Sequence, residues 1–180
     1  MEELKERKII RLKNYDYNNA GIYFVTICTK DRQCILSRIV GTENANATEA
    51  RVELSEYGKI AEKYIRQLND FYDFLSVEKY VIMPNHIHFL LYVNQHNNEN
   101  KAKDNCELEL RHSARNANNT FSKFISTFKR FSNKEYGQNI WQMRAYDHII
   151  RDYKDYEEHF RYICENPINW HFDELYNRMP

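Results

Sequence analysis

The sequence predicts an α+β protein, built as a sandwich of one sheet and several helices. The front half contains short runs rich in β-branched and aromatic residues, GIYFVTIC at 21–28 and HIHFLLYV at 86–93, which are typical of strands. Between them, residues 55–68 have apolar side chains at helical spacing, and the back half shows the same spacing in two longer segments. Because strands dominate one half and helices the other, an α+β architecture is favoured.

Length and composition favour one globular domain, which we expect to span residues 1–180. Hydrophobic residues make up 42% of the 180 residues, and only 4 Gly and 3 Pro occur, which argues against a disordered or collagen-like chain. No apolar run approaches the ~20 residues of a membrane span, and the charged start MEELKERKIIRLK shows no secretory signal. We therefore expect a cytoplasmic protein without membrane contact, whose four cysteines are free thiols rather than disulfides.

The individual elements follow from apolar periodicity and from capping residues. Ser55 is the expected N-cap of the first helix, and Pro167 lies just beyond the expected end of the last one. The dipeptide Pro84-Asn85 predicts a turn or bulge between two strands. The expected strands are 21–28, 34–40, 77–83 and 86–93; the expected helices are 55–68, 120–136 and 152–165; polar loops are expected at 42–50 and, as a variable segment, at about 94–115.

The most specific motif is His86-Ile87-His88. Residues i and i+2 of a strand point to the same face, so the two imidazoles should lie side by side. Two neutral imidazoles on a rigid strand can hold a divalent metal, with a third ligand from elsewhere. The alternative is that both histidines merely occupy an exposed face of the sheet.

A second candidate group is Tyr162 and Asn166 in the segment YICENP. At i and i+4 on a helix they share one face, so a phenol and an amide could both point toward the histidines, as nucleophile and as third ligand. The alternatives are a core tyrosine and a helix C-cap. Other tyrosines compete for the role of nucleophile: Tyr146, Tyr153 and Tyr156.

Charge is unevenly distributed although the formal net charge is zero. Residues 111–151 contain eight Lys or Arg and two acids, interleaved with aromatic residues, whereas residues 152–174 contain seven acids. Such a basic stretch can bind phosphates and stack on bases, or it can be a solvated helix face. Trp141 has the same two interpretations: it stacks on a base of the nucleic acid, or it packs within the protein. The candidates for DNA backbone contacts are Lys129, Arg130, Arg144 and Arg151.

The ordered blocks RLKNYDYNNAGIYFVTICTKDR, LSEYGKIAE, VIMPNHIHFLL, WQMRAYDHIIR and RYICENP resemble the REP-associated tyrosine transposases, which belong to the His-hydrophobe-His (HUH) single-strand DNA transposases. The resemblance covers roughly residues 11 to 170, apart from the segment 94–115. It implies a ferredoxin-like or RRM-like antiparallel sheet with helices on one face, and a catalytic tyrosine on a C-terminal helix laid across the histidines.

The resemblance also implies residue roles and a reaction. His86 and His88 match the metal ligands, Tyr162 matches the catalytic tyrosine, and Asn166 matches the third metal-binding side chain, which is Gln in many members of the wider group. The implied activity is DNA transposition: cleavage and rejoining of single-stranded hairpin DNA with Mg²⁺ or Mn²⁺, through a covalent 5′-phosphotyrosine. Asp147 and His148 are expected to support the site structurally, and the protein to be a monomer or a homodimer.

Two other functions compatible with the residues are a domesticated protein that binds hairpin DNA without cutting it, and an unrelated HxH hydrolase of small molecules. The intact set of candidate site residues argues against the first. The basic, aromatic back half favours a polymer substrate, which argues against the small-molecule hydrolase.

Overall fold

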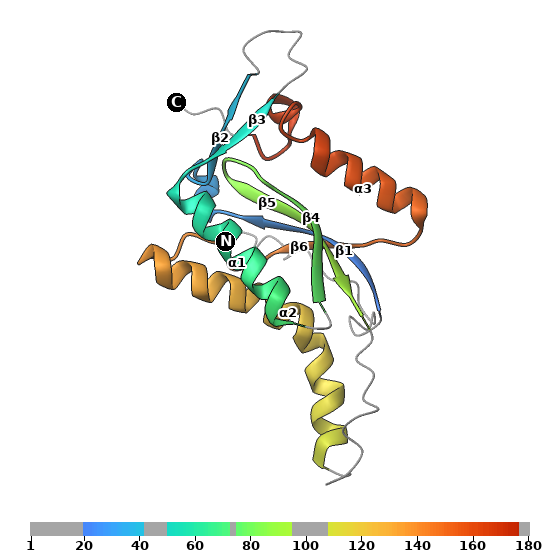
Figure 1. The fold of residues 1–180 in the computed structure, drawn as a ribbon. Coiled ribbons are helices and arrows are strands. Elements are labelled where there is room, and N and C mark those ends of the chain that lie inside the picture. Colours follow the sequence, from blue (N-terminus) through green and yellow to red (C-terminus); the bar gives the residue numbers. More distant parts are fainter. Residues whose placement is uncertain (1–19, 42–49, 73–74, 95–107, 177–180) are drawn as a thin grey trace, which may run out of the picture.

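The computed structural model describes residues 20–41, 50–72, 75–94 and 108–176, with backbone only for 108–120. Its centre is an antiparallel four-stranded sheet in the order β4-β5-β1-β6, and β2 and β3 form a separate two-stranded sheet (Figure 1). The elements in chain order are β1 (Gly21–Cys28), β2 (Ser37–Val40), β3 (Arg51–Leu54), α1 (Glu56–Phe71), β4 (Leu75–Ile82), β5 (His86–Val93), α2 (Leu108–Tyr136), β6 (Tyr146–Ile149) and α3 (Tyr153–Glu165), with short 3₁₀ turns at Lys30–Arg32 and Trp170–Phe172.

The main sheet has the ferredoxin-like connection pattern. Without the small β2–β3 sheet, the chain runs β1-α1-β4-β5-α2-β6, which is a βαββαβ unit with its first and third strands at the centre. The helices α1 and α2 lie on one face of this sheet, and α3 lies on the other (Figure 1). The predicted α+β class with an antiparallel sheet and helices on one face is therefore confirmed for α1 and α2, while α3 covers the other face. No helix in the described part of the chain is long and apolar enough to cross a membrane.

Several predicted elements have the expected bounds. The strand 21–28 is confirmed, Ser55 caps α1 by accepting a hydrogen bond from the backbone N–H of Gly58, and Asp152 caps α3 by accepting one from the N–H of Asp155. The turn at Pro84-Asn85 is tight, because the N–H of Met83 donates to the carbonyl of His86 at 2.8 Å.

Other elements differ from the sequence-based expectation. The predicted strand 34–40 begins only at Ser37, and the strands β3 and β6 were not predicted. The helix α2 begins at Leu108, so the loop expected at 94–115 was wrong over its last eight residues. Those residues lack an apolar stripe, which is why periodicity did not indicate a helix there. The remainder of that loop beyond Asn94, and most of the loop at 42–50, lie outside the described residues.

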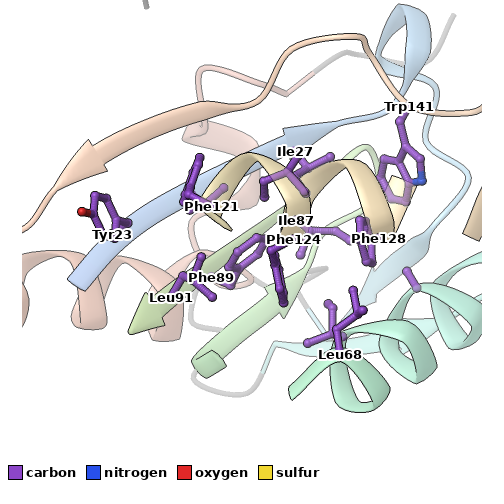
Figure 2. Packing of buried hydrophobic residues seen from close by; sticks show 14 of the residues in the cluster. Tyr23, Ile27, Leu68, Ile87, Phe89, Leu91, Phe121, Phe124, Phe128 and Trp141 are labelled. Atoms are coloured by element: carbon purple, nitrogen blue, oxygen red, sulfur yellow. The ribbon is translucent and has the colours of Figure 1, made fainter. Parts of the chain in front are cut away.

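The main hydrophobic core fills the space between the sheet and the helices α1 and α2. Alternate residues of β1 and β5 point into it, and they meet a row of phenylalanines on α2 (Figure 2). Trp141 packs at one end of this core, is 2% exposed, and donates from Nε1 to Ser132 Oγ at 2.8 Å. Of the two readings of Trp141, packing is therefore confirmed. The labelled core side chains include Tyr23, Ile27, Ile87, Phe89, Leu91, Phe121, Phe124 and Phe128.

A smaller apolar cluster lies on the opposite face of the sheet, under α3. It contains Phe24, Leu90 and Met83 from the sheet region, with Ile163 from α3 and Trp170 from the following 3₁₀ turn. His86 and His88 point to the same face as Leu90, because they share its parity on β5. The fold thus places the histidines between the sheet and the helix that carries Tyr162.

The start of α1 is held against the backbone of Leu36, whose carbonyl accepts hydrogen bonds from Ser55 N and Ser55 Oγ, each at 2.9 Å. A side chain at Gly58 would overlap that same carbonyl oxygen, which cannot move without breaking both bonds. We expect Gly58→Ala to lower the free energy of unfolding by about 2 kcal/mol, because overpacking outweighs the gain in helix propensity. Urea unfolding measures this, with the exposed neighbouring change Lys59→Ala as control; equal stability of the two variants would contradict the expectation.

Candidate metal and tyrosine site

The two histidines of β5 form the floor of the candidate site. Their ring centroids are 4.3 Å apart, and both side chains are buried: His86 is 0% and His88 2% exposed. They come from a central strand that is hydrogen-bonded on both sides, to β4 and to β1, so their backbone positions are fixed. The prediction that the pair shares one face is confirmed, whereas an exposed sheet face is excluded.

Each histidine is oriented through its Nδ1 atom. Asn85 Nδ2 donates to the carbonyl of Leu175 at 2.8 Å, so Asn85 Oδ1 is left as an acceptor, 2.8 Å from His86 Nδ1. The Nδ1 of His86 must therefore carry the proton, which leaves the lone pair of the neutral ring on Nε2. His88 Nδ1 lies 2.8 Å from the hydroxyl of Thr26, on the neighbouring strand β1.

Burial also keeps both rings neutral. It lowers the pKa of His86 to about 4, although the negative charge of Asp173 acts in the opposite direction. Burial likewise lowers the pKa of His88 well below its ordinary value, and the nearby His86 and His159 add to that effect. Since a metal binds the unprotonated nitrogen, these rings are in the form that a metal requires at neutral pH.

Three buried ligand atoms have no hydrogen-bond partner among the residues that the structure describes. They are Nε2 of His86, Nε2 of His88 and Oδ1 of Asn166, whose side chain is 2% exposed. An unpaired buried polar atom costs free energy, so three of them in one region call for an explanation. Two imidazole nitrogens and an amide oxygen are suitable ligands for a divalent cation, and the residues present therefore fit a metal site.

Tyr162 lies next to this group on α3. Its ring centroid is 5.1 Å from that of His88 and 5.9 Å from that of Phe24, and the residue is 43% exposed. The structure thus brings together His86, His88, Tyr162 and Asn166. Of the competing tyrosines, Tyr156 donates its hydroxyl to Glu78, while Tyr146 and Tyr153 are 52% and 72% exposed on β6 and at the start of α3.

A carboxylate that the sequence did not indicate joins the site. Asp173 Oδ2 accepts hydrogen bonds from the hydroxyl of Tyr162 at 2.9 Å and from Asn166 Nδ2 at 2.7 Å. Its carboxylate also lies with the two histidine nitrogens in a group whose ligand atoms are all within 4.8 Å of one another. By binding the amide nitrogen of Asn166, Asp173 leaves the amide oxygen free for a ligand.

The same carboxylate affects the acidity of the phenol. Burial, and next the negative charge and hydrogen bond of Asp173, raise the pKa of Tyr162 above its ordinary value. Tyr162 is therefore a neutral phenol at physiological pH, and its proton points to a potential acceptor. A cation beside the hydroxyl would act in the opposite direction and favour the phenolate.

The four basic candidates are distributed over different parts of the molecule. Lys129 is half-buried and donates to the carbonyls of Gln142 and Met143 at 2.8 and 3.3 Å, and burial lowers its pKa to about 8. Arg130 is exposed on α2, with its guanidinium 4.9 Å from the ring centroid of Phe131, and α2 covers the face of the sheet opposite the histidines.

Arg144 and Arg151, the other two, are exposed, Arg144 in the segment before β6 and Arg151 before α3. Arg144 follows residues that are tethered to β1, since Gln142 N donates to the carbonyl of Cys28, the register partner of His86. Arg151 precedes the N-cap of α3.

The cysteines in the described part of the chain are free thiols, as expected. They are Cys28, Cys34 and Cys164.

Comparison with known proteins adds independent information. No protein-family model matches this chain. An uncharacterized protein of Haemophilus influenzae is 30% identical over 181 residues, covering 96% of this chain and 94% of that protein. A second protein of Haemophilus influenzae, named "Putative REP-associated tyrosine transposase", is 26% identical over 171 residues, covering 94% of this chain and 84% of that protein.

A solved structure has the same fold. It is that of a REP-associated tyrosine transposase bound to a REP hairpin, and it superposes with a TM-score of 0.59 at 20% identity, covering 91% of this chain and 76% of that chain. The relatives thus match over nearly the whole sequence, and the fold agrees with that of a solved transposase. This chain is therefore similar to REP-associated tyrosine transposases over nearly its whole length, and it shares the fold of a solved one.

Proposed function

We propose that the protein cuts and rejoins single-stranded DNA at hairpins, in a metal-dependent reaction that passes through a covalent 5′-phosphotyrosine. The observation that carries the proposal is the set of three buried, unpartnered ligand atoms beside the hydroxyl of Tyr162. A purely structural role would leave these atoms without compensation for their burial.

In this proposal, His86, His88 and Asn166 hold one Mg²⁺ or Mn²⁺, and Asp173 provides an additional oxygen. The two imidazoles favour Mn²⁺ over Mg²⁺, which prefers an all-oxygen shell. When bound, the cation polarises the scissile phosphate and stabilises the negative charge that develops on it.

Tyr162 is the nucleophile. Its Oη attacks the phosphorus, Asp173 Oδ2 accepts the phenolic proton along the 2.9 Å hydrogen bond, and the bond from phosphorus to the 3′ oxygen breaks. The leaving 3′ oxygen takes up a proton, so the products are a 5′-phosphotyrosine and a free 3′-OH. Because the phosphodiester energy is retained in the phosphotyrosine, a later 3′-OH can reverse the step without ATP.

The substrate that we propose is a DNA hairpin with a single-stranded flank. A family member was solved bound to a REP hairpin. In this chain the exposed arginines Arg144, Arg151 and Arg130 are suited to bind phosphates, whereas Lys129 must first leave two carbonyl acceptors. We propose an unpaired flank because both histidines are buried, and a single strand can bring its phosphate to a buried site more closely than a duplex can.

The test uses a labelled hairpin oligonucleotide with a single-stranded flank. With Mn²⁺ we expect a covalent protein–DNA adduct that survives a denaturing gel, and with EDTA no adduct. Tight hairpin binding without any adduct, in Mg²⁺, Mn²⁺ or other divalent metals, would contradict the proposal and support a hairpin-binding protein without cleavage activity.

The hydroxyl of Thr26 provides a more subtle test, because it orients His88 from outside the ligand set. We expect Thr26→Val to reduce Mn²⁺ affinity by about 10–100-fold, as loss of an orienting partner typically does. Isothermal titration with Mn²⁺ measures the effect, and Thr26→Ser, which keeps the hydroxyl, is the matched control. Unchanged affinity in Thr26→Val would show that His88 needs no such orientation.

A further inference from the structure

A second cluster of metal-ligating side chains lies outside the site described above. It consists of His148 on β6 with Asp155 and His159 on α3, and we call it the α3–β6 cluster. Asp155 and His159 are at i and i+4, so they share one face of the helix, and that face meets β6. The ligand atoms of all three residues lie within 4.8 Å of one another.

The distances within the cluster match those of a small transition-metal site. Asp155 Oδ1 lies 3.0 Å from His148 Nε2 and 3.0 Å from His159 Nδ1. Ligands of tetrahedral zinc, with bonds of about 2.0–2.1 Å, are separated from each other by about 3.3 Å. The two imidazole rings are stacked, with centroids 4.5 Å apart and 15° between their planes, so both nitrogens reach the same oxygen.

The carboxylate is also oriented as metal-ligating carboxylates usually are. Its second oxygen, Asp155 Oδ2, accepts a hydrogen bond from the backbone N–H of Arg151 at 3.0 Å and also lies 3.0 Å from His148 Nε2, while Oδ1 is the oxygen near both imidazoles. The three side chains are 28%, 17% and 22% exposed, so an ion can enter from solvent. All three residues lie within twelve positions of the sequence, so a bound metal would link only neighbouring parts of the chain.

We propose that the α3–β6 cluster is a second metal site, which takes Zn²⁺ and fastens the tyrosine-bearing helix to the sheet. Two imidazoles and one carboxylate, with a fourth position left for water, form a common zinc ligand set. For divalent first-row metals, nitrogen ligands bind zinc more tightly than manganese, so the cluster selects a different ion from the one proposed at His86 and His88.

Metal binding requires a defined proton rearrangement. In the structure, His159 Nδ1 lies 2.8 Å from the main-chain carbonyl of Asp155, so Nδ1 carries the proton there, and His148 Nε2 lies 3.0 Å from both carboxylate oxygens. For zinc to bind, the nitrogen of each ring that faces Asp155 must be free of a proton, so that its lone pair is available to the ion.

The cluster is connected to the first site through one aromatic ring. The ring of Phe24 lies 4.7 Å from that of His159 and stacks on that of His88 at 5.0 Å, between centroids. An ion at the α3–β6 cluster would therefore restrict the helix next to the position where Tyr162 contacts the histidines.

Titration of the full-length protein with Co²⁺, a visible probe for tetrahedral zinc sites, tests the proposal without DNA. We expect wild-type protein to bind one more equivalent of Co²⁺ than His148→Gln or His159→Gln, to show intense visible absorption that Zn²⁺ abolishes, and to gain thermal stability with Zn²⁺. The change His171→Ala removes an exposed histidine of the 3₁₀ turn and should leave the stoichiometry unchanged.

Two outcomes would overturn the proposal: equal Co²⁺ stoichiometry in wild type and His148→Gln, or a Zn²⁺-induced stabilisation that persists in His148→Gln. Either would reduce the cluster to a hydrogen-bonded link between helix and strand. Asp155→Asn offers a second variant should the glutamine proteins fail to fold. A His88→Ala protein separates the two sites, since it should keep the visible absorption whatever the outcome at His86 and His88.

Discussion

Replacement of Tyr162 by Phe is expected to reduce the rate of covalent adduct formation with hairpin DNA by at least about 10³-fold, since the variant keeps the ring but has no nucleophilic oxygen. The ring contacts with His88 and Phe24 do not involve the hydroxyl, so the helix should stay in place. The measurement is the rate of adduct formation on a denaturing gel in Mn²⁺.

The control for this variant is Tyr153→Phe, on the same helix. Tyr153 is 72% exposed at the start of α3, far along the helix from the histidines, and its loss should leave the rate within about twofold. Hairpin binding and Mn²⁺ binding should remain in Tyr162→Phe. An adduct as abundant as in wild type would show that another tyrosine attacks, and mass spectrometry of the adduct would identify it.

The largest expected effect on stability concerns Phe124. It is 1% exposed and lies at the centre of the main core, with its ring 5.9 Å from that of Phe89 and 6.3 Å from that of Tyr72 (Figure 2). Phe124→Ala removes these contacts and leaves a cavity between α2 and the sheet. We expect the free energy of unfolding to fall by about 3–5 kcal/mol.

The matched control for Phe124 is Phe131, two turns further along α2. Phe131 is 37% exposed and contacts Tyr64 and Arg130 at the surface, so Phe131→Ala should cost about 1 kcal/mol or less. Chemical denaturation followed by circular dichroism measures both variants. Similar losses of stability would mean that the core tolerates the cavity, which would contradict the tight packing seen around Phe124.

The sequence predicted those parts of the protein in which one physical pattern dominates. The strand β5 alternates between the two faces, so the side-by-side arrangement of His86 and His88 followed from period two alone. The helix α3 was expected at 152–165, with Pro167 just beyond its end, and the structure has it at Tyr153–Glu165. Tyr162 and Asn166 share a face because they are at i and i+4.

What could not be predicted depends on tertiary contacts. The strand β6 is four residues long and is defined by its pairing with β1, which no local pattern indicates. Asp173 lies after a 3₁₀ turn, where no periodicity relates it to Tyr162 eleven residues earlier. Asn85 and Thr26 act on the histidines through hydrogen bonds between side chains, and only coordinates reveal such partners.

Asp173 has a consequence for how strongly the ion and the DNA affect each other's binding. Both imidazoles and the amide are uncharged, so the proposed doubly charged cation would be balanced by one carboxylate and by one incoming phosphodiester. With the ion absent, the same carboxylate would repel the backbone of the nucleic acid at the proposed point of cleavage. Ion and DNA should therefore strengthen each other's binding by the same factor, whichever of the two binds first.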